Sequence, residues 1–138
     1  MAVTYLASLR TNRLNLVVNA LGTATGPTIS VTGTAAGTLV IGTSALSGAT
    51  GVLATITLST TPATVSGDTL TISGTPLSTT ASATGTAALA ELRNNAGTVI
   101  VGGLTVGTSG TNVIISSTSV TSGQTVQVTS GTITHPTT

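Results

Sequence analysis

The segment Thr125-Val126-Gln127-Val128-Thr129 alternates polar and apolar residues at every position. A period of two is typical of a strand with one face in the core and the other in solvent. A second stretch, Val52-Leu53-Ala54-Thr55-Ile56-Thr57-Leu58, alternates in part and places Ile56 and Leu58 on one face. These two segments predict a chain built mainly from β-strands.

Short β-type runs separated by Gly, Ser, Pro and Asn recur from Pro27 onward. A spacing of about ten residues per strand favours an all-β fold, an antiparallel β-sandwich or small barrel of jelly-roll or immunoglobulin-like type. Asn94-Asn95-Ala96-Gly97 and Ser66-Gly67-Asp68 are the best hairpin signals, because Asn and Gly tolerate positive φ. The expected strands are Thr28–Val31, Thr38–Ile41, Val52–Leu58, Thr69–Ser73, Thr86–Arg93, Thr98–Val101, Asn112–Ser116 and Thr125–Thr134.

One N-terminal α-helix is expected over residues 5–21, and Gly22 supplies its stop. Arg10 and Arg13 project from the middle of its apolar stripe, which is an unusual place for a charge. Ser8 and three asparagines lie on the opposite side. The apolar stripe, which spans about 120° at helical spacing, consists of Leu6, Leu14, Val17, Val18 and Leu21.

The length predicts a single domain over residues 1–138. After the helix, residues 22–51 have lower sequence complexity, and we expect a possible extended arm or loop there that depends on a neighbour. Residues 52–138 are expected to form the β-sandwich core.

Charge is almost absent from this sequence. Arg10, Arg13, Asp68, Glu91 and Arg93 are the only side chains with a formal charge among 138 residues, and Lys, Cys, Trp and Phe do not occur. An ordinary soluble domain is about a quarter charged. A free monomer with such a surface has little charge repulsion to keep it in solution. The composition therefore indicates a building block that packs against copies of itself or a larger partner.

The same composition argues against several classes of partner. Phosphate-binding proteins need clustered Lys or Arg, and only Arg10 and Arg13 lie near each other, so we expect no nucleic-acid partner. The longest apolar runs are a few residues, far short of the ~20 that cross a bilayer, and the start of the sequence does not resemble a secretion signal. We expect synthesis in a cytoplasm and no membrane association.

Residues that could carry chemistry are few. Asp68 and Glu91 are the only carboxylates and lie without a flanking motif, while the sole histidine, His135, precedes Pro136 in an expected frayed tail. These groups make neither a credible metal site nor a Ser-His-acid relay. The glycines of Val101–Gly107 lack the spacing of a phosphate-binding loop and are expected to mark a turn. We therefore expect no enzymatic activity and no catalytic, cofactor-binding or metal-binding residues.

Thr-x-Thr pairs raise a separate possibility, a flat ice-binding array. Thr32/Thr34, Thr55/Thr57, Thr69/Thr71 and Thr132/Thr134 would form one if they were in register. Such arrays usually have a fixed repeat, and these pairs are irregularly spaced. Outward threonines on separate strands are the simpler interpretation.

The candidate interaction residues are Arg10, Arg13, Glu91 and Arg93. An arginine beneath an apolar helix face needs a partner, because an unpaired buried charge is costly. Glu91 is the most available carboxylate, and Arg93 lies on the same face of its strand. One hypothesis docks the helix near 86–93 through an Arg–Glu bridge. The other lets one or both helix arginines reach the rim or bind a partner protein.

Several blocks of sequence, in order along the chain, carry a family resemblance. They are Arg13-Leu14 within 11–17, the run Leu53–Ser59, the segment Ala88–Arg93 leading into 96–100, and the closing blocks 107–110, 113–115, 120–126 and 130–134. In these blocks the chain resembles small β-rich structural proteins of tailed bacteriophages.

The resemblance implies a virion structural protein, and specifically a capsid decoration (cement) protein on the virion surface. Its implied partners are the major capsid protein and further copies of itself, as dimers or trimers. A mostly neutral, extensive contact surface suits a protein that bridges capsid subunits and stabilises the head. The alternatives are a tail tube, head–tail connector or fibre-base component. A host-surface or carbohydrate-binding module is a further alternative that fits the sequence less well, because Tyr5 is the only aromatic residue that could stack on a sugar.

Overall fold

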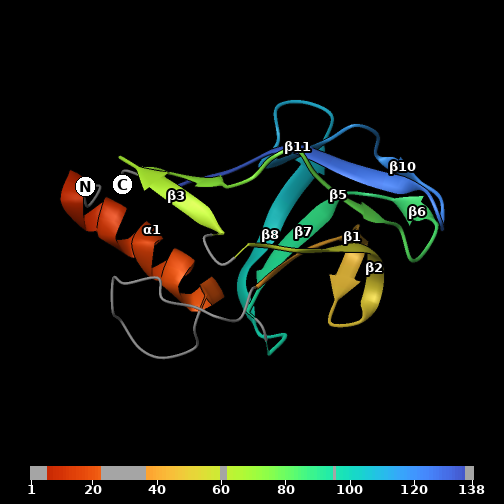
Figure 1. Cartoon of the computed structure of the whole chain (residues 1–138), viewed down its shortest axis with the longest axis horizontal. Helices are drawn as coiled ribbons and strands as arrows, with labels where there is room; N and C mark the ends of the chain where they lie inside the picture. The colour runs from red at the N-terminus through yellow and green to blue at the C-terminus, as the bar shows by residue number, and fades with distance from the viewer. Residues whose placement is uncertain (1–5, 23–36, 60–61, 95, 136–138) are drawn as a thin grey trace, which may run out of the picture.

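The computed structural model describes residues 6–22, 37–59, 62–94 and 96–135. Within them lie one helix and eleven strands (Figure 1). This confirms a mostly β chain with one N-terminal helix. The elements are α1 (Ala7–Gly22), β1 (Thr38–Ser47), β2 (Thr50–Thr57), β3 (Ala63–Ser66), β4 (Thr69–Ile72), β5 (Leu77–Thr80), β6 (Gly85–Thr86), β7 (Leu89–Arg93), β8 (Val99–Gly107), β9 (Val113–Ile115), β10 (Ser119–Val120) and β11 (Thr125–Thr134).

The main sheet runs in the order β2-β1-β7-β8-β9-β11-β4-β3, and β5 also pairs with β11. β6 and β10 form a separate two-stranded pair. All pairs are antiparallel except β8–β9, so the expectation of a purely antiparallel arrangement is wrong. This parallel pairing is short, since it covers only Val106 with Val113 and Gly107 with Ile114, where the chain returns after the loop 108–112.

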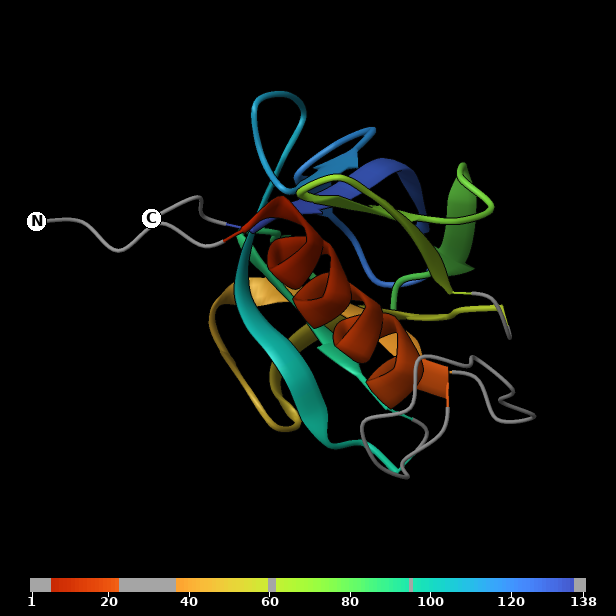
Figure 2. The ribbon, with the colours of Figure 1, turned by 90° about the vertical axis from the view of Figure 1, so that its left-hand side faces the viewer.

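The helix α1 covers one side of the sheet and contacts β3, β4 and β8 (Figure 2). Leu14 and Val18 are buried there, as the stripe predicted. Leu6 is instead 73% exposed and lies just before the helix, where its carbonyl accepts the backbone bonds of Leu9 and Arg10. The predicted apolar stripe is therefore confirmed for Leu14 and Val18 and wrong for Leu6.

The expected arm is wrong for residues 38–51, which form β1 and the start of β2. Thr38–Ile41, also expected as a strand, lies inside the central strand β1, where Leu39 and Ile41 are 0% exposed. β1 is paired on both sides, with β2 and with β7, and its run of buried residues reflects this position. The expected strand Thr28–Val31 lies outside the described residues.

Several strand boundaries differ from those expected. The expected strand over 86–93 is divided into β6 and β7, and β3, β5 and β10 were not anticipated. The prediction of a turn at Val101–Gly107 is wrong, since this segment lies within β8. Gly103 has a φ of 72°, and the register between β7 and β8 slips beside it. These glycines thus make a β-bulge rather than a turn.

Both predicted hairpin turns are confirmed. Gly67 (φ 59°) turns the chain between β3 and β4, and Gly97 (φ 87°) turns it between β7 and β8. The Asn94 side-chain oxygen accepts bonds from the backbone of Ala96 and Thr98, which fixes the second turn. The alternation of 125–129 is confirmed too, with Val126 and Val128 buried and the polar residues exposed.

Threonine and serine line the solvent face of β3, β4 and β11. Thr71 pairs with Thr64 on one side and Thr132 on the other, and Thr69 pairs with Ser66 and Thr134 in the same way. Residues directly opposite in such pairs point to the same face. We call these six residues the hydroxyl ladder. The ladder brings together two of the four Thr-x-Thr pairs, Thr69/Thr71 and Thr132/Thr134. The pair Thr55/Thr57 lies on β2, at the far edge of the sheet. The pair Thr32/Thr34 lies outside the described residues.

Candidate functional site

Arg10 fastens the helix to the β3–β4 hairpin. Its Nε lies 2.6 Å from Oδ1 of Asp68, which directly follows the turn glycine Gly67. Thr11 on the next helical position donates its hydroxyl to the carbonyl of Gly67 at 2.6 Å. Both side chains of the ion pair are largely shielded, at 12% and 25% exposed. The helix N-terminal half is thus held by charge and by hydrogen bonds to one turn.

The end of β11 is tied to the same turn. The backbone N–H of His135 donates to the carbonyl of Asp68 at 2.7 Å, and the residue is half-buried. The expected frayed position of His135 is therefore wrong. Helix, hairpin and last strand meet at Asp68, because its side chain and its carbonyl serve two different neighbours.

The electrostatics of this junction follow from the ion pair. The hydrogen bond from Arg10 lowers the pKa of Asp68, and the charge of Arg10 acts in the same direction, while desolvation opposes both. Reciprocally, the hydrogen bond to Asp68 raises the pKa of Arg10. A carboxyl whose folded pKa lies below its unfolded value stabilises the fold above that unfolded value, and this contribution is lost as the pH falls through the folded pKa.

Asp68→Asn is therefore expected to lower the melting temperature at neutral pH and to reduce the loss of stability on acidification. The unfolded pKa of Asp is about 3.9, so the difference between wild type and variant should shrink below that pH. Thermal melts followed by circular dichroism from pH 7 to pH 2.5 measure both effects. Arg10→Ala should give the same flattened profile. A variant that retains the full wild-type pH profile would contradict this role of the pair.

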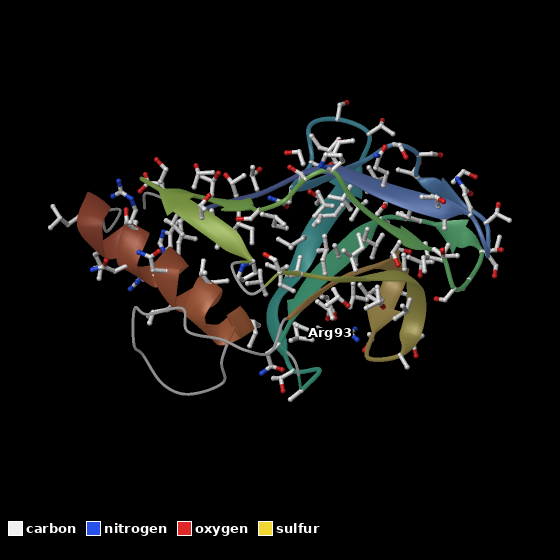
Figure 3. All side chains as sticks on the ribbon, viewed as in Figure 1. Arg93 is labelled. Carbon is white, nitrogen blue, oxygen red and sulfur yellow. The ribbon has the colours of Figure 1, made fainter. Side chains whose placement is uncertain are left out.

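Glu91 and Arg93 form the second charged group, on the outer face of β7. Arg93 contacts Oε2 of Glu91 through Nε at 3.0 Å and Nη2 at 2.7 Å. The same Nη2 donates to the carbonyl of Gly48, in the β1–β2 turn, at 2.7 Å. Figure 3 shows Arg93 reaching toward that hairpin. With the two side chains only 14% and 13% exposed, this pair holds the hairpin against β7.

The proposed Arg–Glu bridge between helix and β7 is therefore wrong. Glu91 is bonded within its own strand, and Arg10 takes the other carboxylate, Asp68. The physical reason is the docking position of α1, which lies on β3, β4 and β8 and not on β7. Arg13 is exposed on the helix, in line with the alternative that a helix arginine reaches the rim.

Sequence reasoning underestimated Asp68, which it assigned only to a turn. The signal was present in Ser66-Gly67-Asp68, a tight turn with an acidic residue at its end, but nothing in the sequence places this turn beside Arg10. Within the described ranges there is no pocket and no group of three or more His, Cys, Asp or Glu residues. The pair Arg10–Asp68 joins α1 to the β3–β4 turn, and Arg93, paired with Glu91 on its own strand, joins β7 to the β1–β2 turn.

Comparisons with protein-family models, with curated proteins and with solved structures found no match to the chain. In the part of the chain that the structure describes, no helix has the length and apolar character needed to cross a membrane.

Proposed function

We propose that the chain is a non-enzymatic structural protein of a tailed-phage virion, a decoration protein that binds the head surface and bridges major capsid subunits. In this role it requires no cofactor, and it acts as a symmetric dimer or trimer. The proposal starts from the family resemblance of the sequence blocks. The structural observation that supports it best is the disposition of charge.

The ion pairs Arg10–Asp68 and Arg93–Glu91 lie within the molecule and are largely shielded from solvent. The hydroxyl ladder places six short neutral side chains on one face of β3, β4 and β11. A neutral surface of this kind can be covered by another protein without desolvating charged groups, which is expensive. It also has backbone and hydroxyl groups available for hydrogen bonds to a neighbour.

The shape of the sheet forms a second part of the proposal. We propose that the curved sheet is a small, partly open barrel in which α1 covers the gap between β8 and β3. The contacts of α1 with both strands support this arrangement. A compact barrel with its helix on one side would suit a spacer that sits on a shell and exposes its loops.

The location of the chain in the particle tests the proposal. Heads and tails of the phage that encodes the chain are separated on a density gradient, and the chain is detected in each fraction by immunoblot. Decoration predicts that the chain sediments with heads. Recovery with tails alone would contradict the proposal and favour the tail or connector alternative, and absence from both would favour a host-surface role.

A further inference from the structure

The helix α1 and the strands contribute unequally to the core. Leu14 and Val18 of α1 are buried, and Val17 packs against the core cluster from a partly buried position. Among the described residues, every other buried member of this cluster lies between Leu39 and Val128. Figure 2 shows α1 in front of the strands, as a layer of its own. The helix therefore depends on the strands for its packing more than the strands depend on the helix.

The sequence of α1 gives the helix little stability of its own. Its 16 residues include three asparagines and two valines, which favour a helix less than Ala, Leu or Lys do. The first turn has no acidic residue and the last turn has no basic residue, so no charged side chain offsets the helix dipole at either end. A helix of this length is marginal in water without tertiary packing. We therefore expect α1 to lose its helical structure when it leaves the strands.

Two polar contacts join the N-terminal half of α1 to the β3–β4 turn. Arg10 Nε lies 2.6 Å from Oδ1 of Asp68, and the Thr11 hydroxyl donates to the carbonyl of Gly67 at 2.6 Å. The turn itself is held by other bonds, because β3 and β4 pair along their whole length and the N–H of His135 donates to the Asp68 carbonyl. The turn can therefore stay in place when these two contacts with the helix break.

We propose that α1 is a lid that opens separately, unfolding away from the strands while the β-part stays folded, and that the Arg10–Asp68 pair holds it closed. Protein segments that bury little apolar surface open locally, at a lower free energy than global unfolding requires. Opening uncovers the parts of β3, β4 and β8 that α1 contacts. This inference goes beyond the proposed function and does not depend on it, because it concerns the chain alone.

The strand β1 provides the reference for the part that stays folded. It is paired with β2 on one side and β7 on the other, and Leu39 and Ile41 are 0% exposed. The amides of β1 are released only when the sheet comes apart. The amides of α1 are released whenever the lid opens, so the two segments should exchange hydrogen through different events.

Native-state hydrogen exchange of the full-length chain, read by mass spectrometry of peptides from α1 and β1, tests this difference. In urea below the unfolding transition, α1 is expected to exchange about tenfold or more faster than β1. Its rate should change little with urea, since local opening exposes little surface, whereas exchange in β1 should accelerate steeply. Equal rates with equal urea dependence in the two segments would overturn the lid, because helix and strands would then open together.

Three variants test which contact holds the lid closed. Asp68→Asn and Arg10→Ala remove a bond that is broken both when the lid opens and when the chain unfolds, so each should speed exchange in α1 and in β1 by about tenfold. Glu91→Gln is the matched control, since it removes the other ion pair, which lies on β7 and stays intact in the open form.

Glu91→Gln should therefore leave exchange in α1 unchanged, whatever its effect on β1. Acceleration of both segments by the same factor in Glu91→Gln would overturn the separate opening of α1. Unchanged exchange of α1 in both Asp68→Asn and Arg10→Ala would overturn the part of the ion pair in closing the lid. The wild-type urea series needs no variant, so it decides on the lid even where a substitution prevents folding.

Discussion

Leu39→Ala is expected to lower the free energy of unfolding by about 2–5 kcal/mol. Leu39 is 0% exposed on the central strand β1, where it lies between Ile56 of β2 and Leu92 of β7. Truncation removes buried apolar area and leaves a cavity that paired strands on both sides cannot easily close. Urea or guanidinium unfolding followed by circular dichroism measures the loss.

Leu16→Ala is the matched control, since it removes the same atoms from a side chain that is 39% exposed on α1. Its effect should stay within about 0.5 kcal/mol of wild type, as is usual for surface positions. Equal effects of the two variants would contradict the position of β1 in the core and would return residues 38–51 to the role of a peripheral arm.

Gly42→Ala is expected to destabilise the fold by about 1–3 kcal/mol. A Cβ at this position would lie 2.6 Å from the carbonyl oxygen of Gly51 and 2.6 Å from Cδ1 of Leu46. The first of these neighbours is backbone, so relief requires the β1–β2 hairpin to move. Because Arg93 holds the same hairpin through Gly48, the strain should also weaken that contact.

Gly102→Ala in β8 is the control for this substitution. Its Cβ would have Val99 Cγ1 as its nearest neighbour, at an ordinary 3.5 Å. Alanine there should be neutral or slightly stabilising, because it restricts the unfolded chain. Chemical denaturation of both variants gives the comparison. If the two variants unfold at the same denaturant concentration, the close approach of the hairpin to Gly42 is contradicted.

The features of the fold that were predictable are those with a local cause. Alternation located the exposed and buried faces of 125–129, and Gly and Asn located the turns at 67 and 97. The position of β1 was harder to predict, since a strand buried on both faces has no alternation and Leu39-Val40-Ile41 is a short apolar run within a low-complexity stretch. Glycines at 102 and 103 suggested a turn because a bulge requires the same residue type.

The two ion pairs differ in how far the sequence could predict them. Glu91 and Arg93 are two residues apart on one strand, so their shared face follows from the period of two. The pairing of Arg10 with Asp68 joins positions 58 residues apart, and local sequence gives no reason to choose Asp68 over Glu91. That choice depends on where α1 docks, which the packing of Leu14 and Val18 on the sheet decides. Leu6 fits the inner stripe on a helical wheel, but it lies just before α1 and is 73% exposed.

The copy number of the chain in the virion tests the proposed decoration role most directly. Quantitative mass spectrometry of purified particles, normalised to the major capsid protein, gives that number. A decoration protein predicts hundreds of copies per particle, at a ratio to the capsid protein close to a simple fraction. A few copies, a small multiple of six, or no copies at all would contradict the account.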